Sequence, residues 1–177
     1  MISVLILGGY CDPEMCIDSS VLDELCDIYI PLLKGVLRYN GITCESIKPT
    51  TPEKLYSISG YTVDNLIYVP FFSCCDEKSS DVSFLYTDST SSASVSFRIA
   101  SRLRKNREDY FKKIVFVNGL NDGHFLKKYS PVVVDNIRFS NTLGRCDNSE
   151  KLYKFAVTTA KCICDNFGII FRDPANA

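Results

Sequence analysis

The chain has 177 residues, of which 46% are hydrophobic and 23% are charged, and its formal net charge at pH 7 is -1. This length is enough for one substantial hydrophobic core and short for two. The composition excludes a disordered tail, and the balanced charge gives no electrostatic attraction to nucleic acid or to an anionic membrane. The longest apolar runs have strand length, so we predict no transmembrane segment. We expect one domain over residues 1–177.

Apolar runs of strand length alternate along the chain with stretches in which apolar residues recur at helical spacing. Such alternation indicates an α/β domain, with a mostly parallel sheet covered by helices on both faces. We therefore predict a single three-layer α/β/α domain with five or six strands. Pro70 cannot donate to a sheet ladder, so we expect it at the end of its strand. The predicted elements are strands at residues 2–7, 42–47, 65–72, 82–86, 114–117 and 132–134, helices at 20–40, 93–105 and 149–167, and a small terminal strand at 168–171.

Nine cysteines are present, and we interpret them as reduced thiols. Their number is odd, and the first residues lack the charged, apolar and cleavage-site pattern of a signal peptide. Cys26, Cys44 and Cys162 fall at apolar positions of predicted helices or strands, where a cysteine behaves as a small hydrophobe. We therefore expect a cytoplasmic protein without disulfides.

The densest basic run extends from Arg98 to Arg107 and is followed by Glu108 and Asp109. A basic run interrupted by acidic residues is typical of the solvated face of a helix. We therefore interpret this run as solvated helix surface rather than as a phosphate-binding patch.

Several strings, taken in order, carry a resemblance that covers nearly the whole chain. The first strand ends in Gly8-Gly9, and a long helix that closes with glycine follows. The strings NLIYVPFFS (residues 65–73), VSFLYTDSTSSASVSFRIASRL (82–103) and PVVVDNIRFSN (131–141) follow in turn. In this order they resemble the zinc-dependent N-acetylmuramoyl-L-alanine amidases, above all those of clostridial phage endolysins.

The resemblance implies a zinc site built from two histidines and a glutamate, with an open position for the water that the metal activates. Gly9, Leu22 and Pro70 stand at the matching ligand positions, and none of them can bind zinc. Asp135 stands in place of the family's catalytic glutamate, on a shorter side chain. The whole chain has one histidine, His124, so the family site cannot be assembled in any alignment.

Other residues could in principle supply a substitute site. Cys11, Cys16, Cys74 and Cys75 follow the first and third predicted strands, but their spacing is not a recognised zinc-ligand pattern. We favour thiols without metal, and a substitute metal site at these four residues stays open. A cysteine hydrolase with His124 as base is a further alternative, although the turn-like surroundings of His124 favour an ordinary loop histidine.

We therefore predict a catalytically inactive amidase homologue that acts as a binding, scaffolding or regulatory protein and uses no cofactor. The resemblance also implies a phage-encoded protein acting in the host cytosol. We expect a protein partner or self-association first and a muropeptide second, with neither nucleic acid nor membrane. Two alternatives stay open: an active cell-wall amidase or hydrolase with an atypical site, and a small-molecule-binding α/β domain.

Two interpretations of Asp135 follow from the loss of the zinc ligands. In the first, Asp135 is buried and structural, with hydrogen bonds from Asn136, Asn141 or the backbone of the Gly8-Gly9 turn, because an unpaired buried carboxylate is costly. In the second, Asp135 lines a binding groove together with Tyr10 and Asn136. We expect the first.

Overall fold

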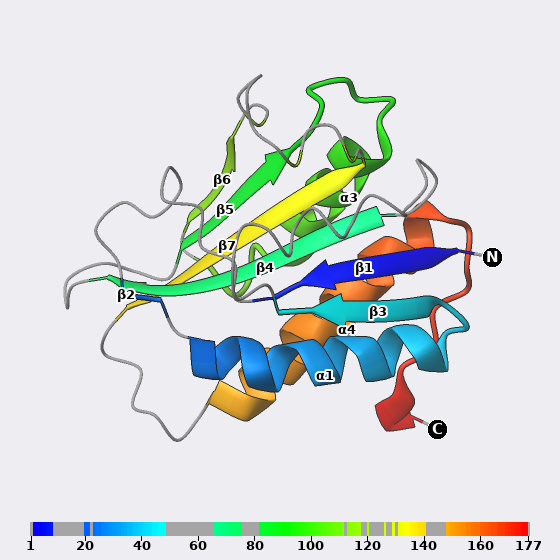
Figure 1. Cartoon of the computed structure of the whole chain (residues 1–177), viewed down its shortest axis with the longest axis horizontal. Helices are drawn as coiled ribbons and strands as arrows, with labels where there is room; N and C mark the ends of the chain where they lie inside the picture. The colour runs from blue at the N-terminus through cyan, green and yellow to red at the C-terminus, as the bar shows by residue number, and fades with distance from the viewer. Residues whose placement is uncertain are drawn as a thin grey trace.

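The computed structural model describes most of the predicted elements (Figure 1). The described residues are 2–8, 20–21, 23–48, 66–75, 82–111, 113–117, 120, 126, 129, 131–140 and 148–176. The strands are β1 (Ser3–Leu7), β2 (Ser20–Val21), β3 (Thr43–Ile47), β4 (Leu66–Cys75), β5 (Val82–Thr87), β6 (Lys113–Val117) and β7 (Val132–Ser140). The helices are α1 (Asp23–Tyr39), α3 (Val95–Asn106), α4 (Asn148–Asn166) and the 3-10 helix η3 (Pro174–Asn176).

The strands form one mixed sheet in the order β3-β1-β4-β7-β5-β6, and β2 pairs with β4. The pairs β1–β3, β1–β4, β4–β7 and β5–β6 are parallel, whereas β5–β7 and β2–β4 are antiparallel. The prediction of an α/β fold with a mostly parallel sheet is confirmed. None of the described helices is long and apolar enough to span a membrane.

Helices α1, α3 and α4 all pack against one face of the sheet, and α3 and α4 lie behind it in Figure 1. We call this the helix face. Its core includes Val4, Ile6, Tyr68, Phe72, Val133 and Ile137 from the strands.

We call the other side the opposite face. Its core includes Leu5, Leu7, Ile67, Val69, Val132 and Val134, packed with Leu120 and Leu126. Tyr129 is a further described residue that packs against this face. Helices α1, α3 and α4 correspond to the three predicted helices and all lie on the helix face, so the described residues do not test the predicted helical cover of the second face.

Two sequence-based placements are wrong. Pro70 does not end its strand: β4 continues to Cys75, because its last residues pair in parallel with the extended strand β7. Residues 168–171 form no strand. After α4 the chain instead docks against the end of α1, where the Asn40 side chain donates to the Arg172 carbonyl at 3.0 Å and accepts from the Arg172 N–H at 2.7 Å.

Candidate functional site

The positions that the resemblance assigns to the family site are only partly described. Pro70, Asp135 and Asn136 lie in β4 and β7. Pro70 and Asp135 are direct partners across these two parallel strands, so their side chains project from the same side of the sheet. Outside the described residues lie Gly9, Tyr10, Cys11, Cys16, Leu22, His124 and Asn141.

Asp135 projects into the helix face and has an exposed fraction of 0%. Its neighbour Asn136 projects to the opposite face, where it accepts a hydrogen bond from Ser73 Oγ at 3.4 Å, and its exposed fraction is 1%. These values agree with the expected burial of Asp135 and argue against the alternative of a groove, because neither Asp135 nor Asn136 lines an open surface.

The dominant partner of Asp135 is Arg107, which the sequence analysis did not single out. Arg107 Nη1 donates to both carboxylate oxygens of Asp135, at 2.9 Å and 2.7 Å. Both side chains have an exposed fraction of 0%. The Arg107 guanidinium also lies 5.5 Å from the centre of the Phe155 ring, a cation–π distance. The pair is thus a fully buried ion pair beneath the sheet.

Further polar side chains extend this ion pair into a network that we call the Asp135 network, comprising Asp135, Arg107, Tyr68, Ser83, Tyr29 and Thr159. Tyr68 donates a short hydrogen bond to Asp135, and Ser83 Oγ donates a weaker one at 3.4 Å. Tyr29 and Thr159 belong to the network through hydrogen bonds to Tyr68 and Arg107 respectively.

The second half of the Asp135 network connects the helices. Arg107 Nη2 donates to Thr159 Oγ1 at 2.7 Å. The Tyr29 hydroxyl lies 2.9 Å from Thr159 Oγ1 and 3.1 Å from the Tyr68 hydroxyl. All of these side chains are buried. The network therefore joins β4, β5 and β7 to α1, α4 and the end of α3.

Burial and charge set the protonation of the Asp135 network. Burial raises the pKa of Tyr29 to about 12, with a smaller opposing effect of Arg107. Burial and the nearby Asp135 raise the pKa of Tyr68 well above its usual value. Burial is the largest single effect on the pKa of Arg107 and lowers it, but Asp135, Tyr68 and Tyr29 together raise this pKa above its ordinary value. Both tyrosines are therefore neutral and Arg107 is cationic at neutral pH.

The interpretation of the whole run from Arg98 to Arg107 as solvated surface is wrong at Arg107. The buried stripe of α3 contains Ser96, Ile99, Ala100 and Leu103. Arg107 follows Leu103 by four residues, which places it on the same side of the helix. As the C-cap residue of α3, it turns its side chain into the core. In the sequence, only its helical spacing from Leu103 indicated that Arg107 is buried.

The zinc site that the resemblance implies does not fit the residues present. Pro70 has no ligating group, and Asp135 already accepts two hydrogen bonds from Arg107 in a place closed to solvent. Among the described residues, no group of three or more histidine, cysteine, aspartate or glutamate side chains could hold a metal ion. Cys74 and Cys75 end β4, and their backbones pair with Phe139 and Ser140.

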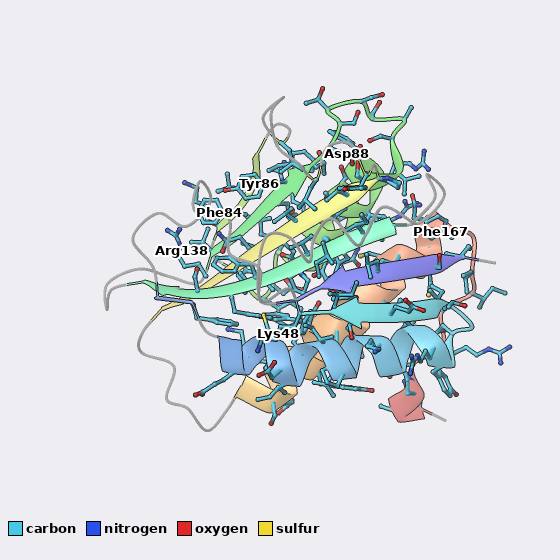
Figure 2. The ribbon with its side chains drawn as sticks, in the orientation of Figure 1. Lys48, Phe84, Tyr86, Asp88, Arg138 and Phe167 are labelled. Atoms are coloured by element: carbon cyan, nitrogen blue, oxygen red, sulfur yellow. The ribbon has the colours of Figure 1, made fainter. Side chains whose placement is uncertain are left out.

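A second cluster of polar and aromatic side chains lies on the opposite face, near the end of β7. Figure 2 shows Arg138, Phe84 and Tyr86 following one another along β7 and β5. The Arg138 guanidinium lies 5.0 Å from the centre of the Phe84 ring. All three side chains are half-buried. We call these residues the Arg138 cluster.

Comparison with known proteins places the fold. No protein-family model matches the chain, and no curated protein matches its sequence. Among solved structures, the chain is similar to the catalytic domain of CwlV, an N-acetylmuramoyl-L-alanine amidase from Bacillus (Paenibacillus) polymyxa var. colistinus. The TM-score is 0.63 at 12% identity, over 96% of this chain and 100% of that one.

Two further solved amidases have a similar fold. AmiC2 of Nostoc punctiforme matches with a TM-score of 0.60 at 12% identity, over 95% of this chain and 97% of that one. CwlD from Clostridioides difficile, solved in complex with the GerS lipoprotein, matches with a TM-score of 0.54 at 13% identity, over 93% and 96%. At these identities the likeness shows the fold alone, which is that of amidase catalytic domains.

Proposed function

We propose that this chain is a non-hydrolytic relative of the peptidoglycan amidases that binds a partner protein. The observation that supports the proposal is the burial of Asp135 and its pairing with Arg107. The residue at the position of the catalytic glutamate is fully buried and held by Arg107 through both of its oxygens. Its carboxylate therefore has a structural role in the core of the molecule.

A carboxylate that acts as a general base must reach a water or substrate proton within hydrogen-bond distance. Asp135 has donors from Arg107, Tyr68 and Ser83 and no exposed surface. Withdrawing it from Arg107 would leave an unpaired buried cation, which costs several kcal/mol, on the order of 3–5 kcal/mol. The closed geometry therefore favours a structural role over proton transfer.

The resemblance to amidases and the single histidine of the chain support the same proposal. A zinc site of the family type needs two histidines, and the chain has one. A fold can keep its frame while its site changes, so function has to be argued from the site. The solved complex of CwlD with GerS shows that a protein of similar fold binds a protein partner, and this supports a binding role here.

Hydrolysis of purified peptidoglycan tests the proposal. The chain is incubated with peptidoglycan with and without added zinc, newly released amino groups are measured, and the zinc content of the protein is determined by mass spectrometry. A zinc amidase such as CwlV serves as the positive control. We expect no release above the buffer blank in either condition.

Two results would overturn the proposal. Amide hydrolysis that disappears in Asp135→Asn, while the variant stays folded by circular dichroism, would show that Asp135 is catalytic after all. Hydrolysis with stoichiometric zinc that disappears in Cys74→Ser or Cys75→Ser, but persists in Asp135→Asn, would establish the atypical metal site that the sequence leaves open.

A further inference from the structure

A groove of about 530 Å³ lies between helix α3 and strand β6, and it shares no residue with the Asp135 network or the Arg138 cluster. Its volume is in the range of sites that bind ligands. The residues that line it are Phe97, Ser101, Arg104, Lys105, Glu108 and Phe116. Those from α3 and its C-terminal end recur at intervals of three or four positions, so one stripe of the helix faces the groove. We call it the α3–β6 groove.

One end of the α3–β6 groove is aromatic. The ring centres of Phe97 and Phe116 are 5.0 Å apart, and the ring planes are tilted by 58°. Both side chains are half-buried, and Phe116 also packs against the core of the helix face. An apolar side chain that covers such rings removes further apolar surface from water. This end of the groove therefore suits an apolar group of a ligand.

Two cations line the other end of the groove. Arg104 and Lys105 are exposed, and in the described part of the chain neither forms an ion pair, not even with Glu108 of the same groove. The lining thus has two positive charges and one negative charge. This excess favours an acidic group of a ligand. It disfavours a nucleic acid, whose successive phosphates need several cations without an acid among them.

Helix α3 places the two ends of the groove along β6. Because β5 and β6 are parallel, α3 leads the chain back from the end of β5 to the start of β6. Phe97, near the start of α3, contacts Phe116, near the end of β6. Arg104 and Lys105 end α3 and therefore lie towards the start of β6. The groove follows the direction of the strand, as an extended ligand would.

β6 is an edge strand, which lies beside β5 in Figure 1. Every second residue of an edge strand directs its N–H and C=O away from the sheet, where another strand can pair with them. On the edge strand β3, Arg38 Nη2 donates to the Cys44 carbonyl at 3.1 Å and Lys34 Nζ donates to Ser46 Oγ at 3.0 Å. In the described part of the chain no side chain forms a hydrogen bond with β6. Of the two edges, β6 is therefore the better template for an added strand.

We propose that an extended acidic segment of a partner protein pairs with the edge of β6 and places its side chains in the α3–β6 groove. Alternate side chains of a strand project from the same face, so those on the helix face of the added strand enter the groove. An apolar side chain covers Phe97 and Phe116, and acidic side chains two or four residues away lie beside Arg104 and Lys105. The inference rests on the proposed function of the chain as a protein-binding relative of amidases.

A synthetic peptide tests this pairing with the full chain. The peptide is an acetylated heptapeptide amide with threonine at its odd positions, leucine at the second, and glutamate at the fourth and sixth. The leucine and both glutamates then lie on one face of a strand. One comparison peptide has glutamine in place of both glutamates, and another has serine in place of leucine. Two more contain backbone N-methyl groups, one at the odd and the other at the even positions.

Fluorescence anisotropy of the labelled peptides measures affinity, and hydrogen exchange measures the protection of backbone amides. We expect saturable binding that protects amides of β6 and leaves those of β3 unchanged. One N-methylated peptide should lose binding and the other should keep it, because a strand pairs with β6 along only one of its edges. The serine peptide should bind about tenfold more weakly, because it loses the apolar contact with the two rings.

Charge changes on the two sides of the interface should have similar effects. The glutamine peptide with the wild-type protein, and the glutamate peptide with the double variant Arg104→Gln/Lys105→Gln, should each bind about threefold to tenfold more weakly. This is the scale of two solvent-exposed ion pairs. Lys161→Gln, a matched change at an exposed lysine of α4, should leave the affinity unchanged.

Four results would each overturn the proposal: no saturable binding, equal affinity for the glutamine peptide, equal binding of the two N-methylated peptides, or protection of β3 in place of β6. Protection of β6 that rises with protein concentration in the absence of peptide would assign this edge to a second copy of the chain, and would also overturn it. Failure of the proposed function is distinguishable, because peptidoglycan hydrolysis by a chain that still binds the peptide would refute that function alone.

Discussion

The charged side chains of Asp135 and Arg107 are both buried. The attraction between the two charges is the main contribution that offsets the loss of hydration of each. Two isolated buried charges would be strongly unfavourable, and the pair is tolerated because its geometry and its further hydrogen bonds are good. Tyr68, Ser83 and Thr159 supply those bonds. The Nε atom of Arg107 remains without a partner, so the network is not complete.

The tyrosines of the Asp135 network predict a loss of stability in alkaline solution. An unfolded tyrosine has a pKa of about 10, whereas burial raises the pKa of Tyr29 to about 12 and that of Tyr68 well above its usual value. The unfolded state therefore releases these protons first. The stabilisation is fully present below the unfolded pKa and is lost as the pH rises through the folded pKa.

Urea denaturation across this alkaline range measures the effect, with the tyrosinate absorbance of the folded protein recorded in parallel. The free energy of unfolding should fall more steeply with pH in the wild type than in Tyr29→Phe, which has one raised group fewer. Equal slopes in the two proteins would show that Tyr29 ionises normally in the folded state.

Sequence reasoning at the residue scale found Asp135 and missed its partner. Asp135 was singled out because the resemblance to amidases assigns it to the position of their catalytic glutamate. Arg107 was missed because it ends a run of charged residues, and a run of charges is usually solvated. Its spacing of four residues from Leu103 indicated a buried position, but the identity of the acid that neutralises it depends on contacts between distant segments.

At the scale of elements, Gly8 at the end of β1 makes room for the Ile30 side chain of α1. A Cβ atom added at Gly8 would overlap the Cδ1 atom of Ile30, and the Gly8 N–H donates to the Ile47 carbonyl at 3.0 Å. The clash involves the far end of a side chain, so the helix is expected to stay in place while Ile30 changes rotamer. The close contact with Ile30 explains why a residue without a side chain stands at position 8.

Gly8→Ala should therefore destabilise the protein by about 1–3 kcal/mol, the usual range for overpacking. Ile30→Val removes the overlapping methyl group and should alone cost about 0.5–1.5 kcal/mol. In the Gly8→Ala background Ile30→Val should cost less or become favourable. Denaturant unfolding of the two single variants and the double variant checks this, and strict additivity would contradict the contact.

Strand β7 shows why element boundaries were harder to predict than element types. The apolar run predicted a strand over residues 132–134, whereas β7 extends to Ser140. Polar Asp135, Asn136 and Arg138 interrupt the run and hide the strand. Each is accommodated by a specific contact, with Arg107, Ser73 and Phe84 respectively, and such contacts are not visible in a local pattern.

At the scale of the whole molecule, the mixed α/β sheet was predictable because alternating strands and helices permit few arrangements. The predicted burial of Cys26, Cys44 and Cys162 also agrees with the structure. The polar interior was not predictable, because hydrophobic periodicity locates a core and does not report which polar groups pair inside it.

Cysteine chemistry gives a prediction for the whole chain. Burial raises the pKa of Cys44, Cys162 and Cys164 to about 11, and only the thiolate reacts quickly with thiol reagents. These three residues should react slowly in the native protein at neutral pH. In denaturant without reductant all nine cysteines should titrate; a deficit in even numbers would reveal disulfides.

The Asp135 network joins the sheet to α1, α4 and the end of α3, so its central ion pair bears on the stability of the whole molecule. Removing one partner of a buried ion pair is strongly destabilising, whereas replacing both by apolar residues of similar size is often neutral. If Asp135 is structural, the effects of replacing Asp135 and Arg107 on the free energy of unfolding should not be additive.

A double-mutant cycle of Asp135→Leu and Arg107→Met, followed by denaturant unfolding, tests this claim most directly. Each single variant should lose about 3–5 kcal/mol of unfolding free energy, and the double variant should lie within about 2 kcal/mol of the wild type. Single variants that each lose less than about 1 kcal/mol, or losses that simply add, would contradict the assignment of Asp135 to the core.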